Sequence, residues 1–334
     1  MSESGGEGAT GEPGIASPER EMRRDPGVGI LIALTDDDRA PATIEVAQSL
    51  TDRKGGRPGV VYVIEVSASV PEAAMVSVAL EDSLRDPGRR AAQEAEMRAL
   101  LHLDDDGKAA WPFSIKVGNV ASVVVQEARI REAGLIVMGL NRHAALGRAI
   151  GRDTVRQVMS HSDVPVLAVS DTLHGLPKRI VVAIDFSRAS IRAARLARRI
   201  VDDSGEMLLL FIEPLLLAGN TESSEGLQLI RDRGVAAAFD ELIADLNSDE
   251  SIPISTKVLK GGKPSARIVS LCEDFDPDLI AMGSQRHRFL DRLLLGSTAR
   301  AVAADGRWSV LVTPPARALQ DPSTRRRVRA SESS

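Results

Sequence analysis

Short apolar runs alternate with segments of helical periodicity along most of the chain. RIVVAID (179–185) and MLLLFIE (207–213) are nearly continuous apolar runs, as expected for strands that are covered on both faces. Between them apolar residues recur at helical spacing, and Ser187 stands where a helix N-cap is expected. The same reading predicts further strands at 255–261, 278–283 and 308–314, and further helices at 226–246, at 263–275 and after Gly296.

This pattern occurs twice in the chain. LIVMGLNRHAALGRAIGRDTVRQV (135–158) aligns without a gap with LIAMGSQRHRFLDRLLLGSTARAV (279–302), and nearly half of the positions are identical. Residues 29–50 align in the same way with 179–200. The first copy also carries helical patterns in AAQEAEMRALLHL (91–103) and NVASVVVQEARIREA (119–133). A repeat of this length indicates the tandem duplication of a whole domain rather than a solenoid.

Strands that alternate with helices are typical of an α/β domain. The sequence therefore predicts two tandem, open, mainly parallel five-stranded sheets with helices on both faces, although the pattern does not give the order of the strands. The predicted organisation is a disordered N-terminal tail at 1–26, a first domain at 27–170, a linker at 171–178, a second domain at 179–315, and a basic disordered tail at 316–334.

Composition narrows the classes of function. Hydrophobic residues make up 43% of the chain and charged residues 27%, as in a soluble globular protein. A net charge of −5 with only 3% aromatic residues argues against nucleic acid as the main ligand. The single cysteine, Cys272, lies in a helical pattern and is expected to be a buried small hydrophobe. The N-terminus shows no secretory signal, and the apolar run at 207–212 is too short to span a membrane, so we expect a cytoplasmic protein.

Candidate ligand-binding residues follow the predicted strands of the second copy. Ligands of open parallel sheets lie outside the carboxyl ends of the strands, where Asp185 follows the first strand and Gly283 and Ser284 follow the fourth. Gly296 then precedes a predicted helix that begins with Ser297 and Thr298. A helix N-terminus attracts anions, and glycine allows phosphate oxygens to approach the backbone. The alternative is that these residues only end a strand, form a turn and cap a helix.

Two copies of this arrangement, ending in LIAMGS, LLLGSTARAV and SVLVTP, closely resemble the universal stress protein family in its tandem form. The resemblance covers about residues 27–170 and 178–315 and implies the adenine nucleotide alpha hydrolase-like fold. The ATP-binding branch of the family carries G-x-x-G-x(9)-G-[S/T] after its fourth strand. By this resemblance Asp185 would lie near the nucleoside, the main chain of Ile212 would contact the adenine, and Gly283, Gly296 and Ser297 would bind the phosphates. ATP would bring Mg²⁺ held mainly by its phosphates.

The second copy departs from this motif at Arg286, which replaces the second glycine. Its side chain either fills the space that the phosphates need, or its guanidinium replaces the amide contacts with a charged one. The first copy departs further, because Thr35 replaces the aspartate and Arg142, Arg152 and Asp153 occupy the other motif positions. We therefore expect no nucleotide in the first copy.

The sequence favours a regulatory protein over an enzyme. It contains no histidine pair at metal-ligand spacing, no nucleophile elbow and no Walker A lysine, so we expect no catalytic residue and no metal site of its own. The main hypothesis is a stress-response regulator that binds ATP or a related adenine nucleotide in its second domain and an unknown protein partner. The alternatives are an interaction module that binds no nucleotide, or a very weak ATPase.

The resemblance also implies that the last strands of two domains pair across a two-fold axis. Within this chain VPVLAVS (164–170) and SVLVTP (309–314) could pair in this way and cover each other's edges. The chain would then be an intramolecular pseudo-dimer, able to act as a monomer or to form a homodimer.

Overall fold

The computed structural model describes residues 29–35, 41–54, 58–65, 111–140, 151–214, 224–247, 251–284 and 296–315. The elements of the first half are β1 (Ile30–Thr35), α2 (Pro41–Lys54), β2 (Gly59–Glu65), β3 (Phe113–Gly118), α5 (Val120–Ile130), β4 (Leu135–Gly139), α6 (Gly151–His161) and β5 (Val166–Val169). Those of the second half are β6 (Arg179–Ile184), α7 (Arg188–Ile200), β7 (Glu206–Glu213), α8 (Ser224–Leu246), β8 (Ile254–Lys260), α9 (Pro264–Phe275), β9 (Leu279–Gly283), α10 (Ser297–Asp305) and β10 (Ser309–Thr313).

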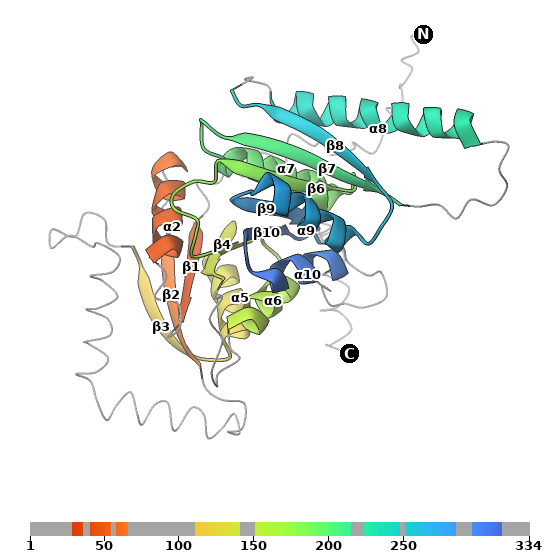
Figure 1. Cartoon of the computed structure of the whole chain (residues 1–334). Helices are drawn as coiled ribbons and strands as arrows, with labels where there is room; N and C mark the ends of the chain where they lie inside the picture. Colours follow the sequence, from red (N-terminus) through yellow and green to blue (C-terminus); the bar gives the residue numbers. More distant parts are fainter. Residues whose placement is uncertain are drawn as a thin grey trace, which may run out of the picture.

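All strands of the described residues belong to one 10-stranded sheet in the order β3-β2-β1-β4-β5-β10-β9-β6-β7-β8 (Figure 1). Each half has the same internal order, with its first strand between its second and its fourth. Every pairing is parallel except that of β5 with β10. The predicted α/β class with mainly parallel strands is confirmed. The two five-stranded sheets are joined edge to edge into one larger sheet.

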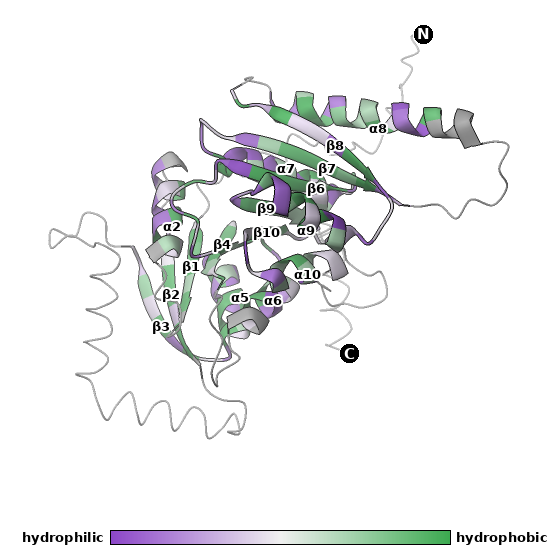
Figure 2. Ribbon diagram, viewed as in Figure 1, coloured by the Kyte–Doolittle hydropathy of each residue, from purple (hydrophilic) through white to green (hydrophobic). Residues whose placement is uncertain are grey.

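Helices cover both faces of this sheet (Figure 1). Residues of α5, α6, α9 and α10 belong to one hydrophobic core, and residues of α2, α7 and α8 belong to the other. Each core contains residues from both halves of the chain, so the interior is continuous across the central strands. In Figure 2 the central strands are mainly hydrophobic, as expected for strands buried on both sides.

The junction of the two halves is the pairing of β5 with β10, which the sequence analysis anticipated. Leu167 lies opposite Leu311 at its centre. At one end the buried Ser309 Oγ accepts a hydrogen bond from the Ser170 amide at 3.0 Å and lies 3.1 Å from the Ser170 hydroxyl oxygen. An edge strand with unpaired amides and carbonyls invites other chains to add to it. The pairing removes one such edge from each half.

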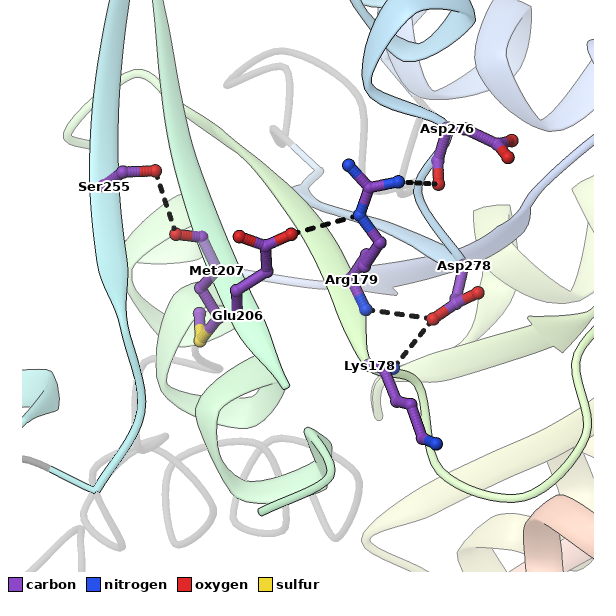
Figure 3. Close-up of polar contacts among 7 residues, drawn as sticks. All are labelled: Lys178, Arg179, Glu206, Met207, Ser255, Asp276 and Asp278. Carbon is purple, nitrogen blue, oxygen red and sulfur yellow. Dashed lines mark hydrogen bonds and ion pairs between the residues drawn. The ribbon is translucent and has the colours of Figure 1, made fainter. Parts of the chain in front are cut away.

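The start of the second half is held at the amino edge of the sheet by two residues (Figure 3). Asp278 Oδ2 accepts hydrogen bonds from the Lys178 amide at 2.8 Å and from the Arg179 amide at 2.9 Å. The Arg179 side chain donates to Glu206 Oε1 at 3.0 Å and to the Asp276 carbonyl at 3.3 Å. These contacts fix the amino end of β6 against β7 and the α9–β9 connection.

Several sequence predictions concern residues outside the described ones. They are the two tails at 1–26 and 316–334 and the helix at 91–103.

Candidate functional site

The carboxyl ends of β6 and β9 form the candidate site. These strands are neighbours in the sheet, and they are the first and fourth strands of the second half, between which the strand order reverses. Asp185 follows β6, and Gly283 and Ser284 lie at the end of β9. Ile212 of β7 lies just past the last paired position of β6 with β7, Ile184 opposite Phe211. The fold therefore brings the predicted residues of these three strands to one edge, at the switch point where open α/β sheets bind ligands.

Asp185 is exposed and organises the turn between β6 and α7. Its Oδ1 accepts a hydrogen bond from the Ser187 amide at 3.0 Å, and its own amide donates to Ser190 Oγ at 3.3 Å. Ser187 Oγ in turn accepts from the Ser190 amide at 3.2 Å, so Ser187 is the predicted N-cap of α7. The carboxylate of Asp185 thus has a structural role beside any contact with a ligand.

Phe186 lies between Asp185 and Ser187, and its backbone is in the left-handed region, with a φ of 57°. This conformation is a genuine outlier for a bulky side chain and is offset by packing. The ring lies 5.4 Å from that of Phe211 and 5.2 Å from that of Phe239, between centroids. Half of the six phenylalanines of the chain therefore meet beside the candidate site. Sequence reasoning did not identify this cluster, although the scarcity of aromatic residues was a signal.

Gly283 has a packing reason to be glycine. A Cβ at this position would lie 2.4 Å from the Ser190 amide nitrogen, 2.6 Å from the Ala189 carbonyl carbon and 2.8 Å from the Ala189 Cβ. The first turn of α7 therefore lies directly against the end of β9. The Ser284 amide continues the sheet by donating to the Thr313 carbonyl at 2.9 Å, and its side chain is buried.

Gly296 has no such packing reason. A Cβ here would meet none of the described residues within 4 Å, and the φ of −52° and ψ of 150° are open to any residue. It is the N-cap of α10 and offers no side-chain hydrogen bond to the first turn. Ser297 is exposed and Thr298 half-buried. The amides at the start of this helix therefore receive no cap from the N-cap residue, and uncapped amides at a helix N-terminus can bind an anion.

Part of the predicted site lies outside the described residues. Arg286 and the Arg–His pairs at 142–143 and 286–287 are among these. In the first half Arg152 lies within the first turn of α6, whereas its counterpart Gly296 precedes α10. The two halves thus differ in backbone structure at this corner of the motif.

Two further results limit the chemistry of the described residues. They contain no group of three or more His, Cys, Asp or Glu side chains that could hold a metal ion. Cys272 is fully buried, as predicted, and burial raises the pKa of its thiol to about 12.

None of the helices that the structure describes combines the length and the apolar character needed to cross a membrane.

A cavity of about 330 Å³ lies away from the candidate site, between α8 and the strands β7 and β8. Sequence reasoning missed it, because the cavity depends on where α8 packs. Phe239 lines this cavity and also contacts Phe186, so the aromatic cluster lies between the cavity and the candidate site.

Comparisons with known proteins agree with the fold and with the repeat. The model of the universal stress protein family matches twice, at residues 29–170 and 177–314. A universal stress protein of Methanocaldococcus jannaschii is 30% identical over 142 residues, which are 41% of this chain and 82% of that protein. The crystal structure of a universal stress protein from Archaeoglobus fulgidus DSM 4304 has a TM-score of 0.56 and 19% identity, and covers 86% of this chain and 97% of that one. A universal stress protein in complex with cAMP matches 42% of this chain and 99% of its own, with 22% identity and a TM-score of 0.33.

Proposed function

The chain belongs to the universal stress protein family in its tandem form, and from this premise we propose that its second half binds ATP or a related adenine nucleotide in a stress-response regulatory role. The nucleoside would lie beside Asp185 and the main chain of Ile212. The phosphates would lie between the end of β9 and the start of α10, with Mg²⁺ carried by their oxygens. Binding would act through contacts with a protein partner rather than through turnover.

The observation that carries this proposal is the N-terminus of α10. It begins at the same edge of the sheet as the ends of β6 and β9, because α10 leads from that edge back to the start of β10. Its N-cap, Gly296, has open space beside it as far as the described residues go, and it provides no side-chain cap. The N-terminus of α7 begins at the same edge on the opposite face, and the dipoles of the two helices add there.

The test is direct. Freshly purified protein is denatured and the supernatant is analysed for released adenine nucleotide, and the thermal midpoint is measured with and without millimolar Mg-ATP. A nucleotide at about 100 times its Kd stabilises the folded state by about 2.7 kcal/mol. We expect Gly296→Glu and Asp185→Ala to abolish this shift, while Thr35→Ala in the first half leaves it intact. The proposal fails if no nucleotide is released and Mg-ATP does not raise the midpoint.

Asp185→Asn is the matched control for Asp185→Ala. The amide oxygen of asparagine can still accept the hydrogen bond from the Ser187 amide, so the turn before α7 is kept while the negative charge is removed. Loss of binding in both variants indicates a role of the carboxylate toward the ligand. Loss in the alanine variant alone indicates that Asp185 acts by shaping the turn.

One observation favours a second candidate, an interaction module that binds no nucleotide. The contact of Gly283 with Ser190 and Ala189 accounts for this glycine without any phosphate. Arg286 at the second glycine position of the motif points the same way. This candidate predicts no released nucleotide and the same thermal midpoint with and without Mg-ATP, while the fold is retained.

A further inference from the structure

The cavity between α8, β7 and β8, which we call the α8 groove, has an apolar floor. Val235, Phe239 and Ile243 of α8 and Val258 of β8 line it. It lies at the free edge of the sheet, where β8 is the last strand (Figure 1). Val258 remains 41% exposed although it belongs to a strand. An apolar hollow at a sheet edge is a surface on which another segment can bind.

The rim of the α8 groove carries an excess of negative charge. Glu213, Asp232 and Asp240 line it together with Lys260, and with Arg231 beside Glu213 one negative charge is left in excess. Lys260 Nζ is shared, at 3.9 Å from Glu213 Oε2 and 3.6 Å from Asp232 Oδ2. Glu213 is also paired with Arg231 at 3.1 Å, whereas Asp240 has no ion-pair partner among the residues that the structure describes. The apolar floor and the acidic rim together suit a segment that carries arginines. The apolar stem of an arginine can pack on the floor while its charged head pairs with a carboxylate of the rim.

The chain itself contains such a segment in 316–334, which carries the run TRRRVRA (324–330). The point from which it starts is fixed. Thr313 ends β10 at the carboxyl edge of the sheet, and Arg192 Nη1 donates to the Pro314 carbonyl at 3.1 Å. Arg192 belongs to α7, which covers the same face of the sheet as α8. An ion pair of 2.7 Å between Arg195 and Asp245 joins these two helices. Pro314, just before the segment, therefore lies on the face where the α8 groove lies.

The distance is short enough for the segment to reach the groove. Four steps along the sheet separate β10 from β8, or about 19 Å at the usual spacing of strands. The ten residues 316–325 span up to about 33 Å when extended. Glu213 and Lys260 lie at the carboxyl ends of β7 and β8, at the same edge as the end of β10. The arginines at 325–329 are thus within reach of the acidic rim.

We propose that the C-terminal segment 316–334 binds in the α8 groove of its own chain, with its arginines on the acidic rim and Val328 on the apolar floor. The proposal rests on the groove and on the charge of the segment, and it holds whether or not a nucleotide binds.

The test is a paramagnetic label on the segment of the full chain. Cys272 is fully buried, so a cysteine introduced by Ser331→Cys can be labelled selectively. At low salt we expect the label to weaken the methyl signals of Val235, Ile243 and Val258 at least twofold. The reference is the same sample after the label has been chemically reduced and is no longer paramagnetic. The exposed Ile130, on α5 at the far half of the molecule, is the internal control and should not change.

Charge variants separate specific docking from random contact. Replacing the four arginines at 325, 326, 327 and 329 with glutamine should abolish the signal loss, and so should about 1 M salt, where the Debye length is about 3 Å. Asp240→Asn should weaken it several-fold, whereas Asp171→Asn, which removes an exposed carboxylate from the linker, should not. An undiminished signal in the labelled full chain at low salt overturns the proposal, as does a signal loss that survives the arginine replacements.

A mixed sample identifies which chain supplies the segment. Chains that carry the paramagnetic label but give no methyl signals are mixed with chains that give methyl signals but carry no paramagnetic label. Full methyl signals in this sample support docking within one chain. Signal loss in the mixture means that the segment of a second copy occupies the groove, and it overturns the proposal of docking within the chain.

Discussion

The two glycines of the phosphate motif should respond in opposite ways to the same substitution. A serine at position 283 places its Cβ 2.4 Å from the Ser190 amide nitrogen and 2.6 and 2.8 Å from two atoms of Ala189. The Cβ of a serine at position 296 meets none of the described residues within 4 Å. Gly283→Ser therefore forces the end of β9 and the first turn of α7 apart, whereas Gly296→Ser only adds a side chain at a helix N-cap.

The size of each effect follows from these contacts. Ordinary contacts of a Cβ begin near 3.4 Å, so each overlap at position 283 is roughly 0.6 to 1.0 Å. Overpacking of this kind costs about 1 to 3 kcal/mol, and we expect the upper end because two of the three atoms are backbone atoms that cannot rotate away. Serine is a better N-cap than glycine by a few tenths of a kcal/mol, so Gly296→Ser should be neutral or slightly stabilising.

Thermal unfolding of both variants without nucleotide measures this difference. At about 2 to 4 °C for each kcal/mol, a loss of about 3 kcal/mol should make Gly283→Ser melt about 6 to 12 °C below the parent. Gly296→Ser should melt at or slightly above the parent. Equal midpoints for the two variants would refute the reasoning, because the motif would then not contain one packing glycine and one free glycine.

Two further predictions concern the pairing of the halves and the response to pH. Ser309→Ala removes the acceptor of the buried Ser170 amide and should lower the free energy of unfolding by about 1 to 3 kcal/mol, while an unchanged urea midpoint would contradict this role. Burial alone would raise the pKa of Glu127, but hydrogen bonds from Arg131 and Lys116 outweigh it and hold the pKa below its ordinary value of about 4.5. The stabilisation is therefore present above that pH and is lost as the pH falls through the lower folded-state pKa. Glu127→Gln should remove this acid-dependent part of the stability profile, and parallel profiles for parent and variant would exclude it.

Hydrophobic periodicity was enough to predict most elements of the second half. The predicted strand at 179–185 is β6, and the predicted helix at 226–246 lies within α8. Ser187 caps α7 as expected. These features depend on neighbours in the sequence, because burial on one or both faces of an element fixes its apolar pattern and a cap acts within one turn.

The order of the strands and the single continuous sheet could not be predicted in the same way. A parallel strand has the same apolar pattern whichever neighbour it pairs with, so the sequence of β6 does not say that β9 lies beside it. The pairing of β5 with β10 was anticipated only through the resemblance. Its hydrogen bond between Ser309 and Ser170 joins residues that are 139 positions apart.

By itself the sequence determined the tandem repeat, the α/β class, the family and the cluster of polar residues at the strand ends. Each of these follows from the local pattern of residues or from identity between the two copies. Only the tertiary structure decided what each of these residues contacts. It shows that Gly283 is held against α7 while Gly296 stands free, although the motif presents them as equivalent. It also shows that Phe186 joins Phe211 and Phe239 beside a groove that no local pattern contains. The physical reason is that close contacts and cavities arise between elements distant in the chain, where packing of whole helices on the sheet sets every distance.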